Sequence, residues 1–348
     1  MVLVGYILVL LVSFYLLAQV SDKYFVVSLD KIAENLKMSH DMAGATLMAI
    51  GSSAPELFVA LIALFKEGGG HEEIGIGTIV GSALFNILAI IGAAAFVRKA
   101  VLVWQPVLRD IMFYMISIIA LWIVFNDGLV TFYESLSLIS LYVLYIIAVA
   151  KWRKILPFTE VDFIEEDEGE EENKGWKVIF IPFDFILGKF FPATRYYVVN
   201  FFISIIMIAV LSWVLVDAAI HVSRILNVPE VIIALTVLAV GTSIPDLISS
   251  IIVARQGRAG MAVSNAIGSN IFDIMIGLGL PWALVYILRG HFVEVKTEGL
   301  MVSIALLFAS VIFIFLVLVV RKWRMGPIVG ATLISLYLLY LVWSGVSI

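Results

Sequence analysis

Three carboxylic acids lie inside long apolar stretches of the chain, where a charged side chain is unfavourable. Glu56, Asp246 and Asp273 each fall near the middle of such a stretch. An ionised acid at the centre of a bilayer costs about 2.5–3.5 kcal/mol on insertion-based scales, and acids in that position mark ion or proton pathways. A bound cation would offset this cost. The three acids therefore predict a cation site at membrane depth.

Neutral oxygen atoms accompany the acids at helical spacing. Hydroxyl residues three or four positions before an acid share a helix face with it. These residues are Ser52 and Ser53 before Glu56, Thr242 and Ser243 before Asp246, and Ser269 before Asp273, while Ser82 stands in the same relation to Asn86.

Two prolines are predicted to release further oxygen ligands. Pro55 and Pro245 lack a backbone N–H, so the carbonyls of the residues four positions earlier, Gly51 and Gly241, lose their helical partner. We expect broken helices here, which are tolerated at membrane depth where the chain lines a polar cavity. Carboxylates, hydroxyls and carbonyls together could supply the roughly six to eight oxygens that calcium prefers. No His, Cys or Met lies among them, which argues against zinc or copper.

The acids belong to a duplicated sequence. Residues 46–57 read TLMAIGSSAPEL and residues 236–247 read TVLAVGTSIPDL, while 81–87 read GSALFNI and 268–274 read GSNIFDI. The two pairs are offset by 190 and 187 residues, so each half carries the same two-helix unit. A lone serine or proline in an apolar helix has an ordinary structural explanation. Duplication with an acid in both copies favours a functional site.

The composition places these motifs in a membrane protein. Of 348 residues, 62% are hydrophobic and 14% charged, and the mean hydropathy is +1.10, whereas soluble domains are about a quarter charged. The absence of cysteine excludes disulfides, thiolate metal sites and cysteine nucleophiles. Long continuous apolar runs indicate helices rather than barrel strands. The predicted spans are 2–20, 41–65, 74–97, 107–125, 129–150, 197–219, 229–253, 261–286, 299–320 and 327–345.

The predicted fold is an all-α membrane protein with ten transmembrane helices built as two inverted five-helix repeats. Five spans separate equivalent points of the duplication, and because five is odd, the two copies enter the membrane from opposite sides. Inverted repeats are typical of secondary transporters, whose binding site lies near the midplane. The first run is expected to be a span rather than a cleavable signal peptide, because no basic segment precedes it.

The basic residues predict the orientation. If the N-terminus is outside, 18 of the 22 Lys and Arg residues fall on the inner side, which matches the excess of positive charge in cytoplasmic loops. We therefore expect both termini outside and a location in the cell (plasma or inner) membrane.

An acidic connection is predicted to divide the chain into residues 1–150, a cytoplasmic linker 151–195, and residues 196–348. Nine carboxylates fall within residues 160–172. A calcium-sensing loop is one interpretation, but the spacing is not that of an EF-hand loop. A solvated, self-repelling linker is the preferred interpretation.

The duplicated motifs resemble the repeats of the calcium/cation antiporter superfamily. Residues 241–282, with GSSAPELF at 51–58 and GTIVGSALFNILAIIG at 77–92, look most like the potassium-dependent sodium/calcium exchangers. The resemblance implies a sodium-driven antiporter in which Glu56 and Asp246 form a central calcium site flanked by sodium sites. The other ligands it implies are Ser52, Ser53, Ser82 and Asn86, then Thr242, Ser243, Ser269 and Asp273, with the backbone carbonyls of Ala49 and Ala239 for sodium.

Potassium dependence rests on one residue. Asp273 is similar to the aspartate that the potassium-dependent branch uses for potassium, although some potassium-independent prokaryotic members also keep Asp there. The resemblance implies calcium, sodium and potassium as transported ions and no cofactor. The expected partners are these ions and the lipid bilayer, with no nucleic acid and no evident protein partner.

Four other functions are compatible with parts of the sequence. A potassium-independent sodium/calcium exchanger and a calcium/proton antiporter are the nearest, but the proton-coupled branch usually carries Gly-Asn before the repeat acid, where this chain has hydroxyl residues. An intramembrane aspartyl protease would need a tyrosine before Asp273 and a Gly-x-Gly-Asp motif, and residues 277–280 read GLGL. A channel would not need an inverted repeat. We therefore expect a transporter and not an enzyme.

Overall fold

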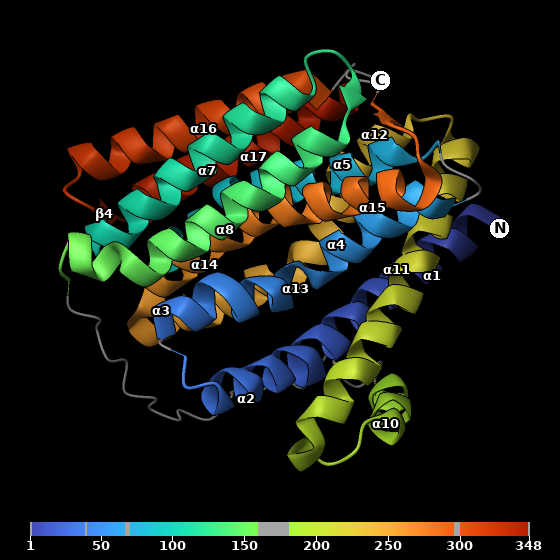
Figure 1. Cartoon of the computed structure of the whole chain (residues 1–348), viewed down its shortest axis with the longest axis horizontal. Helices are drawn as coiled ribbons and strands as arrows, with labels where there is room; N and C mark the ends of the chain where they lie inside the picture. The colour runs from blue at the N-terminus through green and yellow to red at the C-terminus, as the bar shows by residue number, and fades with distance from the viewer. Residues whose placement is uncertain (1, 39, 67–69, 159–180, 296–299, 347–348) are drawn as a thin grey trace.

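The computed structural model describes residues 2–38, 40–66, 70–158, 181–295 and 300–346. Within these ranges, ten helices are long and apolar enough to cross a membrane, which confirms the predicted ten-span helical fold. Both termini lie at the same end of the bundle (Figure 1), as an even number of crossings requires. The acidic residues 160–172 lie outside the described residues, so both interpretations of them stay predictions.

The first helix of each repeat is longer than predicted. In the first repeat the helix continues past residue 20 to Asn35, because charged residues end the apolar run without ending the helix. Its counterpart α11 (Tyr197–Leu226) has 30 residues. The N-terminal helix packs against α11 and consists of α1 (Val2–Val20), the π-helical segment η1 (Ser21–Val26) and α2 (Val27–Asn35).

The remaining elements follow in two matching series. In the first repeat they are α3 (His40–Ala43), η2 (Gly44–Met48), α4 (Ala49–Phe65), α5 (Glu72–Phe85), η4 (Asn86–Ile90), α6 (Ile91–Val97), β1 (Ala100–Val101), α7 (Trp104–Val124), β2 (Leu129–Val130) and α8 (Phe132–Ile155). The short helices α10 (Ile181–Phe190) and η6 (Thr194–Tyr196) precede the second repeat. After α11 come α12 (Glu230–Ile233), η7 (Ala234–Leu238), α13 (Ala239–Val253), η8 (Ala254–Arg258), α14 (Ala259–Phe272), η9 (Asp273–Leu278), α15 (Gly279–Arg289), β3 (Val293–Glu294), α16 (Leu300–Val320), β4 (Arg324–Met325) and α17 (Pro327–Val346).

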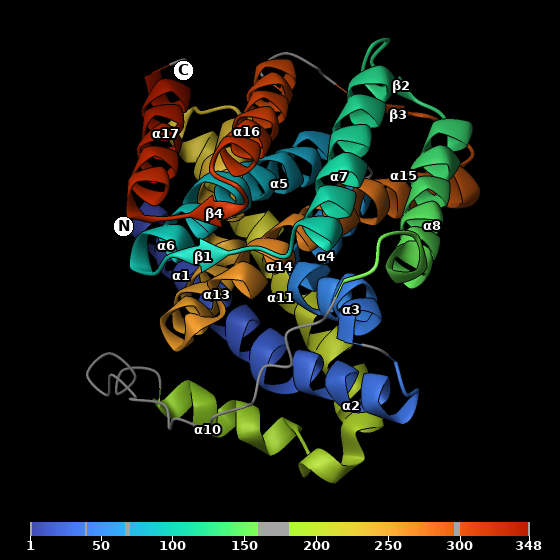
Figure 2. The ribbon, with the colours of Figure 1, turned by 90° about the vertical axis from the view of Figure 1, so that its left-hand side faces the viewer.

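The helices form three layers (Figures 1 and 2). The long first helices of the two repeats form one side of the molecule, and α7, α8, α16 and α17 form the opposite side. The helices that carry the duplicated motifs lie between these layers. The span from Glu72 to Val97 is the most enclosed, with 89% of its most apolar stretch buried. The duplicated motifs therefore occupy the interior.

Two short antiparallel strand pairs join the repeats at opposite ends of the bundle. β1 pairs with β4, with Val101 opposite Arg324, and β2 pairs with β3, with Leu129 opposite Glu294. Each pair takes one strand from each repeat. β1 and β2 stand at the two ends of α7, whose 21 residues span about 32 Å. The two pairs are therefore equivalents under the inverted symmetry.

Equivalent π-helical segments interrupt the helices of both repeats. η2 and η7 lead directly into α4 and α13, the helices that contain Glu56 and Asp246, and η4 and η9 begin at Asn86 and Asp273. π-helical turns are frequent at functional sites. The local irregularity is therefore duplicated together with the sequence.

The prolines do not break their helices, so this prediction was wrong. α4 and α13 continue through Pro55 and Pro245. At Gly51, whose carbonyl loses its partner at Pro55, the hydroxyl of Ser21 donates a hydrogen bond to that carbonyl at 3.0 Å. A side chain from the neighbouring helix thus replaces the missing backbone donor, and α4 continues as an α-helix through Pro55.

Gly81 lies where α5 and η7 approach too closely for a side chain. A Cβ atom on Gly81 would lie 2.4 Å from the carbonyl oxygen of Leu235, whereas its repeat counterpart Gly268 has no atom within 4 Å of that position. We expect Gly81→Ala to separate the helices and lower the free energy of unfolding by about 1–3 kcal/mol. Gly268→Ala should not lower it. Thermal unfolding of both variants in detergent tests this contact, and equal melting temperatures would contradict it.

Candidate cation-binding site

The helices with the duplicated motifs meet at the centre of the fold. α4 and α5 pack against α13 and α14, and η9 also contacts α4 and α5. Of the predicted ligands, Ser52 and Asp246 are partly exposed. The others are buried, namely Ala49, Ser53, Glu56, Ser82, Asn86, Ala239, Thr242, Ser243, Ser269 and Asp273.

The three acids differ in exposure. Glu56 is 2% exposed and Asp273 is 1% exposed, whereas Asp246, the repeat counterpart of Glu56, is only half-buried. Asp246 and Glu56 repel each other when both are ionised, and Asp273 repels both of them. Within the described residues, however, no group of three or more His, Cys, Asp and Glu side chains could hold a metal ion. A cation bound here would need oxygens from neutral residues as well.

Hydroxyl groups connect the two repeats beside Glu56. The hydroxyl oxygens of Ser82 and Ser243 are 2.9 Å apart. Ser243 also donates to Oε1 of Glu56 at 3.3 Å. This chain of contacts leads from α5 to α13 and on to α4. Predicted ligands that are more than 160 residues apart in sequence are therefore in direct contact.

Four buried oxygens of predicted ligands lack a hydrogen-bond partner. Nine such side-chain atoms occur among the described residues, and four of them are Oε2 of Glu56, Oδ1 of Asp273, Oγ of Ser53 and Oδ1 of Asn86. Buried polar atoms in folded proteins are nearly always paired, and an unpaired one costs about 1–3 kcal/mol. A cation coordinated by these oxygens would remove that cost.

The two predicted carbonyl ligands have equivalent surroundings. Ser52 donates to the carbonyl of Ala49 at 3.3 Å, and Thr242 donates to the carbonyl of Ala239 at 3.4 Å. Each repeat therefore places a hydroxyl oxygen beside a carbonyl oxygen at the start of the helix that carries its acid.

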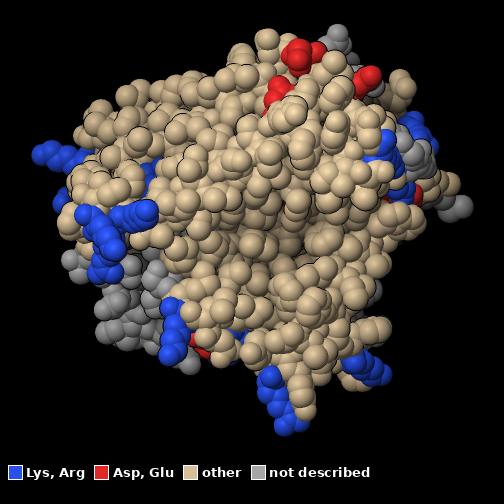
Figure 3. Space-filling view, in the orientation of Figure 1, with Lys and Arg blue, Asp and Glu red and all other residues tan. Residues whose placement is uncertain are grey.

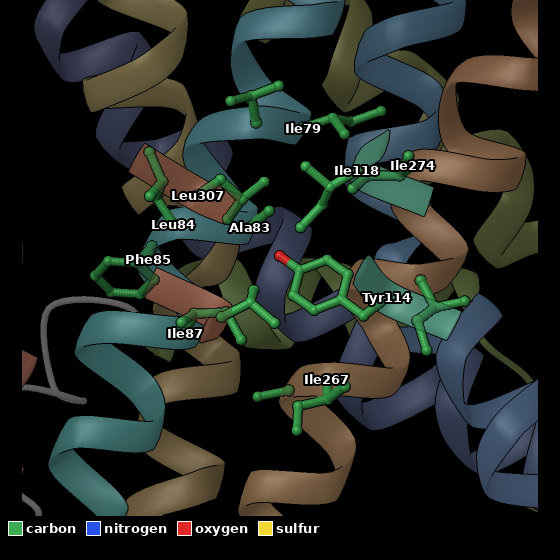
Figure 4. Close-up of a cluster of buried hydrophobic side chains, with 14 of the residues drawn as sticks. Ile79, Ala83, Leu84, Phe85, Ile87, Tyr114, Ile118, Ile267, Ile274 and Leu307 are labelled. Carbon is green, nitrogen blue, oxygen red and sulfur yellow. The ribbon is translucent and has the colours of Figure 1, made fainter. Parts of the chain in front are cut away.

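A buried amide cluster beside the site was not predicted. Asn86 Nδ2 donates to Oδ1 of Asn270 at 2.8 Å and to Oγ of Ser269 at 3.4 Å. Asn270 Nδ2 donates to the carbonyl of Ala83 at 3.1 Å and to the hydroxyl of Tyr114 at 3.0 Å. Figure 4 shows the Tyr114 hydroxyl directed into the apolar cluster toward Ala83. The sequence signal that could have predicted this cluster is the position of Asn270 in an apolar span, directly after the predicted ligand Ser269.

Asn270→Ala should destabilise this part of the fold. The change removes the hydrogen bonds that Asn270 makes with the Asn86 amide, the Ala83 carbonyl and the Tyr114 hydroxyl in a fully buried position, and we expect the free energy of unfolding to fall by about 1–3 kcal/mol. Asn265→Ala on the exposed face of the same helix is the matched control. Denaturant unfolding measures both, and equal stability of the two variants would show that the cluster contributes nothing.

The sequence matches one family over most of its length. The model of the family described as sodium/calcium exchanger protein matches residues 6–151 and 196–346. Sodium/potassium/calcium exchanger 2 of Gallus gallus is 30% identical over 492 residues, which cover 94% of this chain and 75% of the relative. Sodium/potassium/calcium exchanger 4 of Homo sapiens is 29% identical over 498 residues, covering 96% of this chain and 80% of the relative.

Solved structures share the fold. A structure of the sodium-calcium exchanger NCX_Mj has a TM-score of 0.60 at 23% identity and covers 98% of both chains. The H+/Ca2+ exchanger CAX has a TM-score of 0.72 at 16% identity and covers 97% of this chain and 82% of its own. At these identities the likeness establishes the fold, ten membrane helices in two inverted repeats.

Proposed function

The chain belongs to the sodium/calcium exchanger protein family, and from this premise we propose that it is a sodium-driven calcium antiporter that works by alternating access. The relatives named above are sodium/potassium/calcium exchangers, so the proposal includes potassium as an ion carried with calcium. Transport, and not covalent chemistry, is the activity that an inverted-repeat membrane fold with a midplane site supports.

The unpaired oxygens at the repeat interface carry the proposal. Glu56, Asp273, Ser53 and Asn86 each keep one buried oxygen without a partner. They come from both repeats and include two acids. Calcium and sodium are hard cations that prefer such oxygens. We propose these atoms, together with Asp246 and the flanking hydroxyls and carbonyls, as the ion ligands.

Charge balance explains why the two sets of transported ions would exclude each other. Glu56, Asp246 and Asp273 carry three negative charges when ionised. One calcium with one potassium neutralises them, and so do three sodium ions. Calcium with potassium and the three sodium ions compete for the same oxygens, so each set of ions displaces the other. Three bare carboxylates in a low-dielectric interior are unfavourable, and this disfavours reorientation of the empty carrier.

The driving force requires several sodium ions per calcium. A tenfold sodium gradient is worth about 1.4 kcal/mol per ion, whereas holding calcium four decades lower inside takes about 5.5 kcal/mol. The membrane potential contributes about 2.3 kcal/mol per charge per 100 mV. Exchange of three sodium ions for calcium alone moves one net positive charge inward and so uses the sodium gradient and the membrane potential, whereas their exchange for calcium with potassium is electroneutral and uses the ion gradients alone.

The conformation described here is proposed to be closed at the end that carries the termini. Two partly buried polar pairs tie the repeats together there: Lys66 Nζ lies 2.7 Å from Asp217 Oδ1, and His71 Nδ1 lies 2.7 Å from Glu230 Oε2. Asp246, by contrast, is half-buried. We propose that ions enter this conformation from the opposite end, past Asp246.

The orientation and the division of the chain are part of the same proposal. We place both termini outside, so the end with β1 and β4 faces the cytoplasm of a cell whose plasma or inner membrane holds the protein. Residues 1–150 and 196–348 form the two halves, joined by the cytoplasmic linker 151–195.

Proton coupling is the second candidate, because the H+/Ca2+ exchanger CAX shares the fold. The hydroxyl residues before both acids favour sodium, since they add neutral oxygens where a proton needs none. Radioactive calcium uptake into liposomes that hold the purified protein decides between the candidates. We expect uptake to require an outward sodium gradient and to rise with potassium. Uptake driven by a pH gradient without sodium would overturn the proposal.

A further inference from the structure

A basic cavity lies at the end of the bundle opposite the termini. Figure 3 shows Lys and Arg side chains gathered at this end, on the left, where β4 lies in Figure 1. The cavity has a volume of about 550 Å³, and none of its lining residues is acidic. The lining consists of Lys99, Arg321, Arg324, Met325, Gly326, Pro327 and Ile328.

The pairing of β1 with β4 brings the cations of this cavity together. Lys99 directly precedes β1 and Arg324 begins β4, so the strand pair places residues more than 220 positions apart on one rim. The turn before β4 contains two residues with left-handed backbone, Lys322 (φ 51°) and Trp323 (φ 61°), which reverse the chain after α16. The arrangement is therefore set by the backbone.

The cations have no partner among the described residues. Lys99, Arg321 and Arg324 make no hydrogen bond or ion pair through their side chains there. α17 begins at Pro327 in the same lining, so the positive end of a 20-residue helix faces the same region. Three unpaired cations and a helix N-terminus around one cavity form a receptor for an anion.

The equivalent strand pair at the other end shows that the fold does not need these cations. There the β2 and β3 region carries Asp127 and Glu294. A general excess of positive charge on the cytoplasmic side accounts for the number of cations at this end. It does not account for their convergence on one cavity.

Apolar side chains beside the cavity identify the source of the anion. Val320 is 80% exposed, Ile328 is 72% exposed and Val101 is 70% exposed. Trp104 and Trp323 form a ring pair nearby, with centroids 6.3 Å apart, and tryptophan is enriched at the membrane interface. A soluble phosphate would leave the apolar side chains in water, whereas acyl chains would cover them.

We propose that this cavity binds the phosphate headgroup of an anionic phospholipid from the adjacent leaflet. Lys99, Arg321 and Arg324 contact the phosphate, and the exposed valine and isoleucine side chains contact the acyl chains. Basic pockets between transmembrane helices on the cytoplasmic side bind anionic headgroups in this way. The site is separate from the ion ligands of the proposed function.

Native mass spectrometry of the full chain in detergent tests the proposal, with phosphatidylglycerol and phosphatidylcholine as probes. We expect phosphatidylglycerol to bind and phosphatidylcholine not to bind. The double variant Arg321→Gln/Arg324→Gln should bind phosphatidylglycerol about 30-fold more weakly, at about 1 kcal/mol per cation. Lys151→Gln/Lys154→Gln, at the exposed end of α8, makes the same change in net charge and should leave binding unchanged.

Three further results would overturn the assignment. Equal losses in the two double variants would show attraction to net charge alone. Displacement of the lipid by inorganic phosphate at millimolar concentration would indicate a free-phosphate site. A large gain in lipid binding when Glu165, Glu166, Asp167 and Glu168 are neutralised would indicate that the acidic linker fills the cavity. Binding is measured without transport, so failure here leaves the exchanger proposal untouched.

Discussion

We expect the replacement of Glu56 by Gln to abolish sodium-driven calcium uptake in reconstituted liposomes. The substitution keeps the size of the side chain and the acceptor for Ser243, but it removes the charge of the buried acid. Loss of one member of a buried charge pair costs about 3–5 kcal/mol, which weakens binding more than 100-fold. Asp246→Asn removes the counterpart acid and should have the same effect, since the proposal has both repeats contribute to one calcium site.

The control separates loss of binding from loss of folding. Glu294→Gln, at the exposed position of β3, also removes one carboxylate and should leave uptake unchanged. The melting temperature of Glu56→Gln should not fall below that of the native chain, because a buried acid without a bound ion is itself unfavourable. Normal uptake by Glu56→Gln or by Asp246→Asn would remove the proposed calcium site.

Replacing Asp273 by Asn should separate the roles of the ions. The first repeat carries Asn86 at the equivalent position, where it begins a π-helical segment just as Asp273 does, so the fold accepts an amide there. The variant lacks one of three negative charges, and we expect it to exchange calcium for sodium without stimulation by potassium. Calcium uptake measured with potassium from zero to a saturating concentration gives a rising curve for the native chain and a flat one for the variant.

Three outcomes would contradict this assignment. If uptake by the native chain is already indifferent to potassium, the exchanger is potassium-independent and Asp273 serves another ion. If Asp273→Asn stops calcium exchange altogether, Asp273 is a calcium ligand. A variant that keeps potassium stimulation excludes Asp273 from the potassium site.

The sequence predicted the architecture because its strongest signals are long and repeated. Apolar runs of about 20 residues are set by bilayer thickness, and a duplicated motif separated by an odd number of spans leaves only an inverted arrangement. The first helix was cut short at residue 20 because the hydropathy falls there, although the structure continues the helix through Asp22 and Lys23 to Asn35.

Local backbone and cross-repeat contacts could not be predicted in the same way. Pro55 and Pro245 predict a break, yet α4 and α13 continue through them. At Gly51 the replacing donor is Ser21 of a neighbouring helix, and a local sequence window does not show such a contact. The same reason hid the contact between Asn86 and Asn270. The candidate ligands could be named from spacing and duplication, but the partly exposed position of Asp246 depends on the packing of both repeats.

The most direct test of a shared ion is a structure determined with calcium and without sodium, with anomalous difference density to identify the metal. The account predicts one peak between the carboxylates of Glu56 and Asp246, with ligand oxygens at about 2.3–2.6 Å. Addition of sodium should remove it. A calcium peak elsewhere, with Glu56 and Asp246 facing separate surroundings, would contradict the account.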